Sequence, residues 1–161
     1  MTVYDPEMMT RVRQAIARVD AEEYLNALVE FAAIREDTKG KPFPTEGLSY
    51  YGLCVALVEK EYETAIEMAR KAIELQFYRA DHYLNLSKIH AARGDRKRAV
   101  EIADEGLGVV PGDPKLKEFR EELGVRQPKA IRFLDRSNPV NKSIGRARRS
   151  KDEEGREARD G

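Results

Sequence analysis

Tryptophan is absent from this sequence of 161 residues, and cysteine occurs only once, at position 54. A disulfide needs two thiols and a cysteine-based zinc cluster needs more, so Cys54 excludes both within the chain and agrees with a reducing compartment. No run of about 18 apolar residues is present, and the first residues lack the basic start and apolar stretch of a secretory signal. These absences predict a cytoplasmic protein with no membrane span.

Patterns that carry catalysis are equally scarce. His82 and His90 are the only histidines, and no spacing argues that either pairs with Cys54 as base and nucleophile. The sequence has no glycine-rich loop to cradle a phosphate, no paired metal motif and no dinucleotide fingerprint. We therefore expect no metal, no cofactor and no enzymatic activity, with His90 in the core or in a seam between helices.

Charge is abundant but unevenly distributed. Charged residues make up 36% of the chain, yet the formal net charge is +0. Residues 124–150 carry one acid, Asp135, against eight basic side chains: Arg126, Lys129, Arg132, Arg136, Lys142, Arg146, Arg148 and Arg149. The last eleven residues carry three bases and five acids, which leaves a net charge of minus five for residues 1–123. The sequence thus predicts an acidic body with a basic tail.

A segment of thirteen residues has a counterpart with a similar pattern of small and apolar residues 34 positions later. ETAIEMARKAIEL at 63–75 aligns with KRAVEIADEGLGV at 97–109, which pairs Ala65 with Ala99. Small residues at such positions let two helices approach closely, and either the same close contact or simple sequence drift explains the mid-helix Gly106. Repetition at this period indicates a tandem array of helical hairpins.

The second copy carries a recognisable pattern in both helices, at the turn and at its end: Tyr83, Leu86, Ser87, Gly94, Asp95, Ala99 and Pro111. This pattern resembles the tetratricopeptide repeat (TPR) family. The first copy departs from it, because Gly52 lies 13 residues before Ala65, one more than the corresponding spacing in the second copy. We expect the extra residue in the turn between the two helices of the first copy.

The resemblance implies an all-α fold, a TPR-type helical-hairpin solenoid of about seven helices with two clear repeats at 46–79 and 80–113. A degenerate hairpin at 6–36 precedes them, and a capping helix at 114–123 and a basic C-terminal tail follow. We expect three parts in the chain: a TPR-like helical domain at 1–124, a basic extended segment with a short helix at 125–150, and a disordered tail at 151–161.

Helix starts are marked by a capping side chain directly before a proline that pre-sets the first helical dihedral: Asp5-Pro6, Asp113-Pro114 and Asn138-Pro139. Thr45 is expected to cap the helix that follows the loop at 37–45. In the capping helix, Leu116, Phe119 and Leu123 form one apolar stripe that shields the last open seam of the array.

The resemblance also implies a ligand on the concave face, which is lined by the first helix of each hairpin. Eight residues make up our candidate partner-binding site: Tyr50, Leu53, Leu57, Asp81, Leu84, Asn85, Lys88 and Lys115. This mixture of apolar and polar side chains suits an extended or helical peptide. A solvated helix face without any ligand explains Asn85 and Lys88 equally well, and that alternative stays open.

One TPR subgroup clamps the C-terminal carboxylate of heat-shock chaperones with lysines, asparagines and often an arginine. Asn85 and Lys115 match two of those positions. Ser49, Leu53 and Phe119 stand where other clamp residues belong. Because of these departures we do not expect that particular ligand.

Scaffold building does not explain the basic tail. It contributes six candidate phosphate contacts: Arg132, Arg136, Lys142, Arg146, Arg148 and Arg149. Only Phe133 is available there for base stacking, and the acidic parts of the chain would repel a phosphate backbone. We therefore favour a tail that folds back onto the acidic body as an internal plug, or that makes a second contact to a protein partner.

The function predicted from these features is that of a protein–protein interaction adaptor or scaffold, which holds a peptide segment of another protein in the concave groove. The alternative is a nucleic-acid or ribosome-associated factor that contacts phosphates through residues 126–149. We expect no membrane partner, and either a monomer or a weak homodimer through residues 6–36.

Overall fold

The computed structural model of the protein describes residues 2–124, and within this range the chain forms helices and no strand. The elements follow in order: α1 (Pro6–Asp20), α2 (Tyr24–Asp37), α3 (Thr45–Cys54), the π-helical turn η1 (Val55–Glu59), α4 (Tyr62–Leu75), α5 (Ala80–Arg93), α6 (Arg96–Val109) and α7 (Pro114–Gly124). The all-α class is therefore confirmed for the described residues. The helix expected near Asn138 and the tail expected at 151–161 lie outside them.

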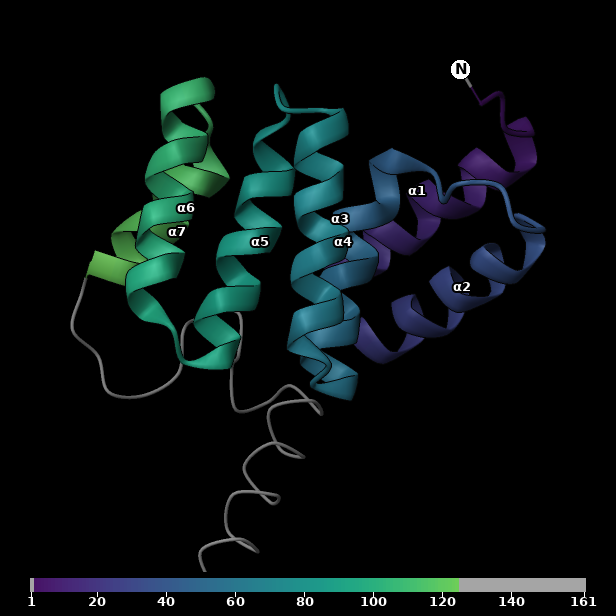
Figure 1. The fold of residues 1–161 in the computed structure, drawn as a ribbon, viewed down its shortest axis with the longest axis horizontal. Coiled ribbons are helices and arrows are strands. Elements are labelled where there is room, and N and C mark those ends of the chain that lie inside the picture. The colour runs from purple at the N-terminus through teal and green to yellow at the C-terminus, as the bar shows by residue number, and fades with distance from the viewer. Residues whose placement is uncertain (1, 125–161) are drawn as a thin grey trace, which may run out of the picture. The chain divides into compact units, whose positions relative to one another are not determined.

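The helices are arranged as consecutive hairpins, in which α1 packs on α2, α3 on α4 and α5 on α6 (Figure 1). The odd-numbered helices α1, α3, α5 and α7 also contact one another in chain order. Each even-numbered helix packs on the next odd-numbered one, so that α7 closes the last hairpin. Side chains from four different helices are thereby brought into one layer.

Two of the expected helix starts are confirmed by their caps. α1 begins at Pro6, where the Asp5 carboxylate accepts the backbone N–H of Glu7 at 3.0 Å. α7 begins at Pro114, and the carboxylate of Asp113 accepts the backbone N–H of Leu116 at 2.9 Å. In each case the side chain satisfies an amide that has no partner within the helix.

The expected cap at Thr45 is wrong. α3 begins at Thr45 itself, and Pro44 occupies the capping position without a side-chain hydrogen bond. Pro44 has φ −55° and an extended ψ of 119°, so the helical conformation can begin only after it. Thr45 is therefore the first helical residue.

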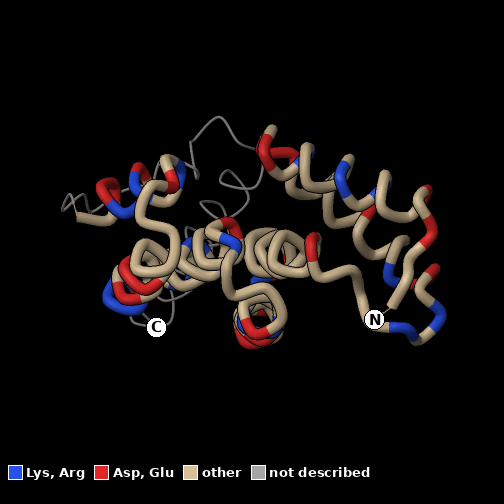
Figure 2. The backbone as a smooth tube through the Cα atoms, turned by 90° about the horizontal axis from the view of Figure 1, so that it is seen from above, with Lys and Arg blue, Asp and Glu red and all other residues tan. Residues whose placement is uncertain are grey.

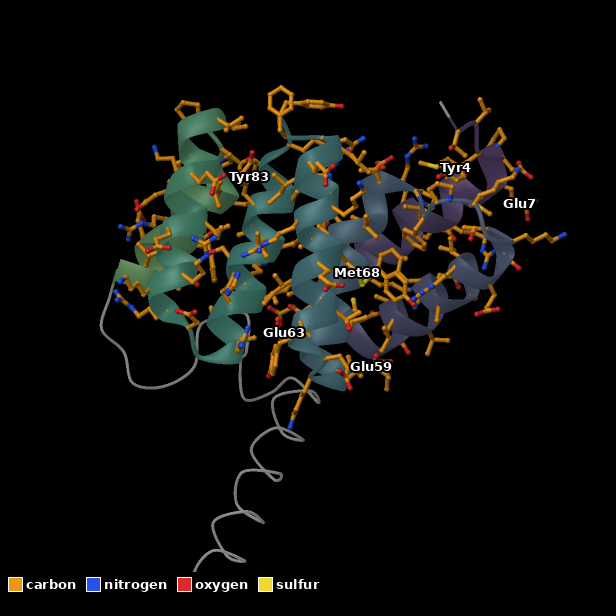
Figure 3. The ribbon with its side chains drawn as sticks, in the orientation of Figure 1. Tyr4, Glu7, Glu59, Glu63, Met68 and Tyr83 are labelled. Atoms are coloured by element: carbon orange, nitrogen blue, oxygen red, sulfur yellow. The ribbon has the colours of Figure 1, made fainter. Side chains whose placement is uncertain are left out.

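The α5–α6 hairpin closes through close contacts at small residues. The Ser87 hydroxyl on α5 donates to the backbone carbonyl of Ala99 on α6 at 2.6 Å. A Cβ added at Gly106 would lie 2.6 Å from Cβ of Tyr83, which is labelled on α5 in Figure 3, and 2.7 Å from Leu116 Cδ2. Close helix contact at Gly106 is thus confirmed, and it explains a glycine in mid-helix.

The extra residue predicted for the α3–α4 hairpin lies in a helix and not in the turn between the two helices. The end of α3 continues as the π-helical turn η1, which holds one more residue than an α-helical turn of the same height. Lys60 then ends the helix with a left-handed φ of 59°, and Gly94 takes the corresponding place in the second hairpin with φ 93°. The insertion is absorbed without breaking the first helix.

The N-terminal hairpin over 6–36 is confirmed, and an aromatic cluster joins it to the rest of the body. The rings of Phe31 on α2 and Tyr51 on α3 stack with centroids 5.5 Å apart. Phe43, in the loop between them, lies 5.2 Å from Tyr51 and 6.1 Å from Phe31. At the other end, Leu116, Phe119 and Leu123 of α7 are buried, as their stripe predicted.

Charge is unevenly distributed among the helices. α3 contains a single charged residue, Glu46, whereas α7 carries three bases and three acids (Figure 2). α3 carries little charge because it packs on α1, α2, α4 and α5, whereas α7 packs on α5 and α6 at one end of the array. None of the described helices is long and apolar enough to cross a membrane.

Candidate partner-binding surface

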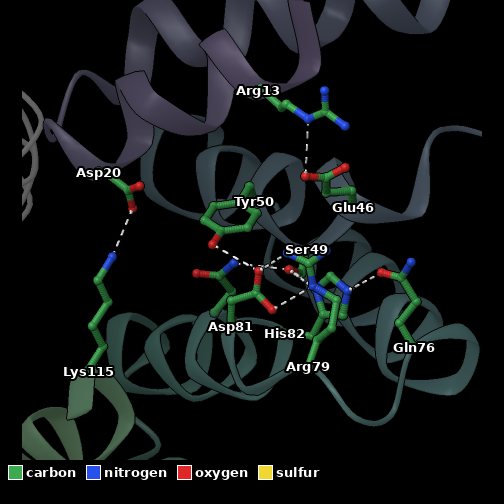
Figure 4. A network of polar contacts seen from close by, with 11 residues as sticks. Arg13, Asp20, Glu46, Ser49, Tyr50, Gln76, Arg79, Asp81, His82 and Lys115 are labelled. Carbon is green, nitrogen blue, oxygen red and sulfur yellow. Dashed lines mark hydrogen bonds and ion pairs between the residues drawn. The ribbon is translucent and has the colours of Figure 1, made fainter. Parts of the chain in front are cut away.

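Polar side chains connect the odd-numbered helices with one another (Figure 4). Three contacts do this: Arg13 Nε with Glu46 Oε1 at 3.7 Å, Tyr50 Oη with Asp81 Oδ2 at 3.1 Å, and Lys115 Nζ with Asp20 Oδ1 at 3.8 Å. Asp20 ends α1 and Lys115 lies in the first turn of α7, so the first and last described helices approach each other. The odd-numbered helices α1, α3, α5 and α7 therefore all contribute polar side chains to this layer.

Asp81 is the centre of the first polar group in this layer. Arg79 donates to it twice, from Nε at 3.1 Å and from Nη2 at 2.7 Å, and the Tyr50 hydroxyl donates to it as well. Burial raises the pKa of the Asp81 carboxyl, but the hydrogen bonds from Arg79 and Tyr50 and the nearby positive charge together outweigh burial and leave this pKa below its ordinary value. Burial and the charge of Asp81 raise the pKa of Tyr50, which keeps its hydroxyl protonated as a donor.

A second polar group joins α3 to α5 and to the loop before α5, and all its members are buried except the half-buried Gln76. Asn85 Nδ2 donates to Ser49 Oγ at 3.0 Å, Ser49 Oγ lies 2.7 Å from His82 Nδ1, and His82 Nε2 lies 2.9 Å from Gln76 Oε1. The Gln76 carbonyl can only accept, so Nε2 carries the proton and Nδ1 accepts from Ser49. Burial lowers the pKa of His82 to about 4, and the ring is therefore neutral near pH 7.

The Ser49–His82 contact resembles a nucleophile and its base, but its setting is structural. Both side chains have no exposed surface, so no substrate reaches the hydroxyl. The third partner is the neutral amide of Gln76 rather than a carboxylate that would stabilise a charged ring. Cys54 is buried as well, and burial raises the pKa of its thiol above the ordinary value.

His90 is the other buried histidine, and neither ring nitrogen has a hydrogen-bond partner among the described residues. Burial lowers the pKa of His90, so this buried ring on α5 is neutral near pH 7. This placement agrees with the expected core or seam position. No group of three or more metal-ligating side chains occurs in residues 2–124.

Lys88 and Lys115 form the third polar group, near the C-terminal end of α1. The Lys88 ammonium lies 6.0 Å from the centroid of the Phe119 ring, a distance typical of a cation–π contact. Burial lowers the pKa of Lys88, the nearby carboxylate of Asp20 raises it, and the positive charge of Lys115 lowers it again. Two lysines and an acid from three helices thus share one polar region.

The structure divides the eight predicted site residues by depth. Leu53, Leu57, Leu84 and Asn85 are buried, Tyr50, Asp81 and Lys88 are half-buried, and Lys115 is exposed. The buried members lie in the packing between helices of the array, where a partner could not touch them without rearrangement. The half-buried and exposed members keep part of their surface accessible to a partner.

Two residues near this surface were not expected from the sequence. Asp20 is 95 positions from Lys115, its ion-pair partner, and nothing in the local pattern connects them. His82 was noted only as a lone histidine, although its two ring contacts join α3 to the loop before α5. The predicted basic contacts at Arg132, Arg136, Lys142, Arg146, Arg148 and Arg149 lie outside the described residues.

Comparison with models of protein families gives no match, and a search of curated proteins gives none either.

Proposed function

We propose that this chain is a protein-interaction module of the TPR type, whose layer of odd-numbered helices holds a peptide segment of a partner protein. The observation that carries the proposal is the succession of hairpins in which one helix of each contributes to a shared layer. A rigid array of this kind offers one extended surface built from several repeats. The sequence period of 34 residues supports the same class.

The contact residues we propose are Tyr50, Asp81, Lys88 and Lys115, which retain exposed atoms on α3, α5 and α7. The buried members of the predicted site hold these helices in register with one another. They are Leu53, Leu57, Leu84 and Asn85. Both signs of charge and an aromatic hydroxyl are present, which suits the backbone and mixed side chains of a peptide. Lys115 is paired with Asp20 only at 3.8 Å and at the surface, so a carboxylate of the partner can replace Asp20 at small cost.

The test is affinity capture from native-cell lysate with the full chain, followed by titration of each captured protein after purification. Lys88→Met combined with Lys115→Glu removes one positive charge and reverses another. We expect this variant to bind the partner at least about tenfold more weakly, as for charged contacts near the centre of an interface. Lys117→Glu is the matched control, because Lys117 is exposed on the same helix as Lys115.

Equal affinity of the double variant and the control would contradict the proposal. A thermal unfolding scan of each variant separates lost binding from lost folding. Nuclease treatment of the lysate tests whether the captured protein is held through a nucleic acid rather than directly.

A second candidate function is suggested by the charge of the C-terminal segment. Residues 124–150 carry seven more positive than negative charges, enough to neutralise several phosphates. A nucleic-acid or ribosome-associated factor would lose all binding when residues 125–161 are deleted, and its affinity would fall steeply with salt. The adaptor function predicts instead that binding to the purified partner survives this deletion, with the basic segment as a second contact.

A further inference from the structure

An aromatic pair projects from the loop between α4 and α5. Phe77 and Tyr78 are 62% and 60% exposed, and their rings meet edge to face with centroids 5.7 Å apart and an interplanar angle of 82°. Leu75, the last residue of α4, is 51% exposed beside them. Exposed apolar side chains that occur together mark interaction sites on many proteins.

This loop is held in place by hydrogen bonds from three directions. The Tyr83 hydroxyl donates to the Phe77 carbonyl at 2.9 Å, and the Arg79 N–H donates to the Gln76 carbonyl at 3.1 Å. The Gln76 side chain accepts from the buried His82 ring. The two rings are therefore presented in a fixed arrangement, and a partner that binds them loses little loop entropy.

A further exposed apolar residue lies at the end of the next hairpin. α4 and α6 both end where the following odd-numbered helix begins, and Figure 1 shows these two loops at the same end of the helices. Val109, the last residue of α6, is 42% exposed. We use the name apolar loop patch for the exposed apolar residues of these two loops, which are Leu75, Phe77, Tyr78 and Val109.

We propose that the apolar loop patch binds a short, uncharged apolar segment of another protein, at a site separate from the layer of odd-numbered helices. Charge argues for this class of ligand. Residues 109–112 carry no charge, and Arg79, the only charged residue in 75–80, is neutralised by Asp81. A patch with so little net charge has nothing to attract a phosphate backbone or an anionic lipid surface.

Area decides between a short segment and a second copy of the chain. With about 200 Å² for each free aromatic side chain, the four residues offer roughly 400 Å² of apolar surface, the size of a functional patch on a monomer. A stable interface between folded proteins buries about 800 Å² on each side. The patch supplies about half of that, which fits a short segment that inserts apolar side chains against the two rings.

The experiment is selection of random dodecapeptides, displayed on phage, against the immobilised full chain, with affinities of the enriched peptides measured by fluorescence anisotropy. We expect enriched peptides that are neutral and apolar, and at least about tenfold weaker binding to Phe77→Ser combined with Tyr78→Ser. The control is Leu25→Ser with Val29→Ser, which alters a second exposed apolar pair, on α2. It should bind the peptides within about twofold of the unaltered chain.

Peptides that are charged, or that bind the Phe77/Tyr78 variant as well as the control, would overturn the proposal, as would failure to enrich any peptide. Two further measurements test other occupants. A dimer in sedimentation velocity that disappears in the Phe77/Tyr78 variant would assign the patch to a second copy. Co-sedimentation with phosphatidylserine vesicles that depends on the same residues would assign it to a membrane surface. The Lys88/Lys115 variant leaves the patch intact, so failure of either proposal is distinguishable from failure of the other.

Discussion

In the α3–α4 hairpin, Gly52 lies against the backbone of Ala65, and a Cβ there would stand 2.9 Å from the Ala65 carbonyl oxygen. In the α5–α6 hairpin Ser87 takes the place of Gly52, and its hydroxyl donates to the corresponding carbonyl, that of Ala99, at 2.6 Å. One hairpin avoids a side chain and the other uses one as a donor. The comparison teaches that the repeat preserves the close approach of two helices and not the residue that permits it.

The hairpins also differ on their second helices. Ala72 of α4 is buried without conflict, whereas its counterpart Gly106 on α6 is crowded by Tyr83 and Leu116. Between the two hairpins lies the buried chain of Ser49, His82 and Asn85, which has no counterpart inside either hairpin. Four predictions test these differences, beginning with the largest effect.

Lowering the pH should weaken the buried contact between the α3–α4 hairpin and the α5–α6 hairpin. The pKa of His82 is about 4 in the folded chain and about 6.5 when unfolded, so the unfolded state binds more protons between these values. Stability is therefore fully present above pH 6.5 and falls by about 3 kcal/mol as the pH drops to 4. Urea unfolding from pH 7 to 4.5 measures most of this loss, at pH values where the Asp81 carboxylate is still ionised.

Two variants assign the acid effect. His90 also has a lowered pKa and adds to the loss in the same direction, so His90→Phe should reduce the pH dependence only in part. His82→Asn should remove most of it. An unchanged pH dependence in His82→Asn would place the acid sensitivity elsewhere.

Replacing Gly106 by alanine makes the second hairpin resemble the first. Overpacking against Tyr83 and Leu116 should destabilise the fold by about 2 kcal/mol, in spite of the better helix propensity of alanine. Gly108 on the same helix has no atom within 4 Å of an added Cβ, so Gly108→Ala should instead stabilise by up to about 1 kcal/mol. Urea midpoints that shift in the same direction for both variants would contradict the close contact.

Two buried serines test different contacts. Ser49 tests the contact between α3 and α5, and Ser87 tests the contact within the α5–α6 hairpin. Ser49→Ala leaves both His82 Nδ1 and Asn85 Nδ2 without a partner and should cost about 2 kcal/mol. Ser87→Ala removes one hydrogen bond to a carbonyl and should cost about 1 kcal/mol. Thermal unfolding of the two variants compares them directly, and a greater loss in Ser87→Ala would reverse the assignment.

The smallest effect is expected at the turns. Lys60 holds a left-handed φ of 59° where the second hairpin has Gly94 at φ 93°. Lys60→Gly should therefore stabilise by about 0.5 kcal/mol, since only glycine adopts this conformation without steric cost. Gly94→Ala should destabilise by about 1 kcal/mol, and chemical denaturation of both tests the pair.

Much of the fold follows from local signals. The Asp-Pro pairs predicted the starts of α1 and α7, and the repeat suggested a tight contact at Gly106. The extra residue before Ala65 was recognised but assigned to the turn, because a count of residues does not distinguish a longer turn from a π-helical one. Thr45 was misjudged because Pro44 already ends the extended segment.

The candidate site was predictable only in part. Helical periodicity places Leu53, Leu84 and Asn85 on one face of their helices, but each odd-numbered helix packs on more than one neighbour, so that face is partly covered. The contact of Tyr50 with Asp81 crosses a repeat boundary, and its existence depends on the stagger of α3 against α5. The period of a pattern carries no information about that stagger.

Helix type, hairpin order and the positions where small residues are needed all follow from the sequence, because they depend on capping, periodicity and residue size within about 34 positions. Depth is different. Whether Asn85 is a contact or a buried donor, whether Lys115 meets Asp20, and whether Phe77 and Tyr78 remain exposed depend on how each hairpin is rotated against the next. That rotation is set by the sum of many weak side-chain contacts between distant segments, and it becomes visible only in the folded chain.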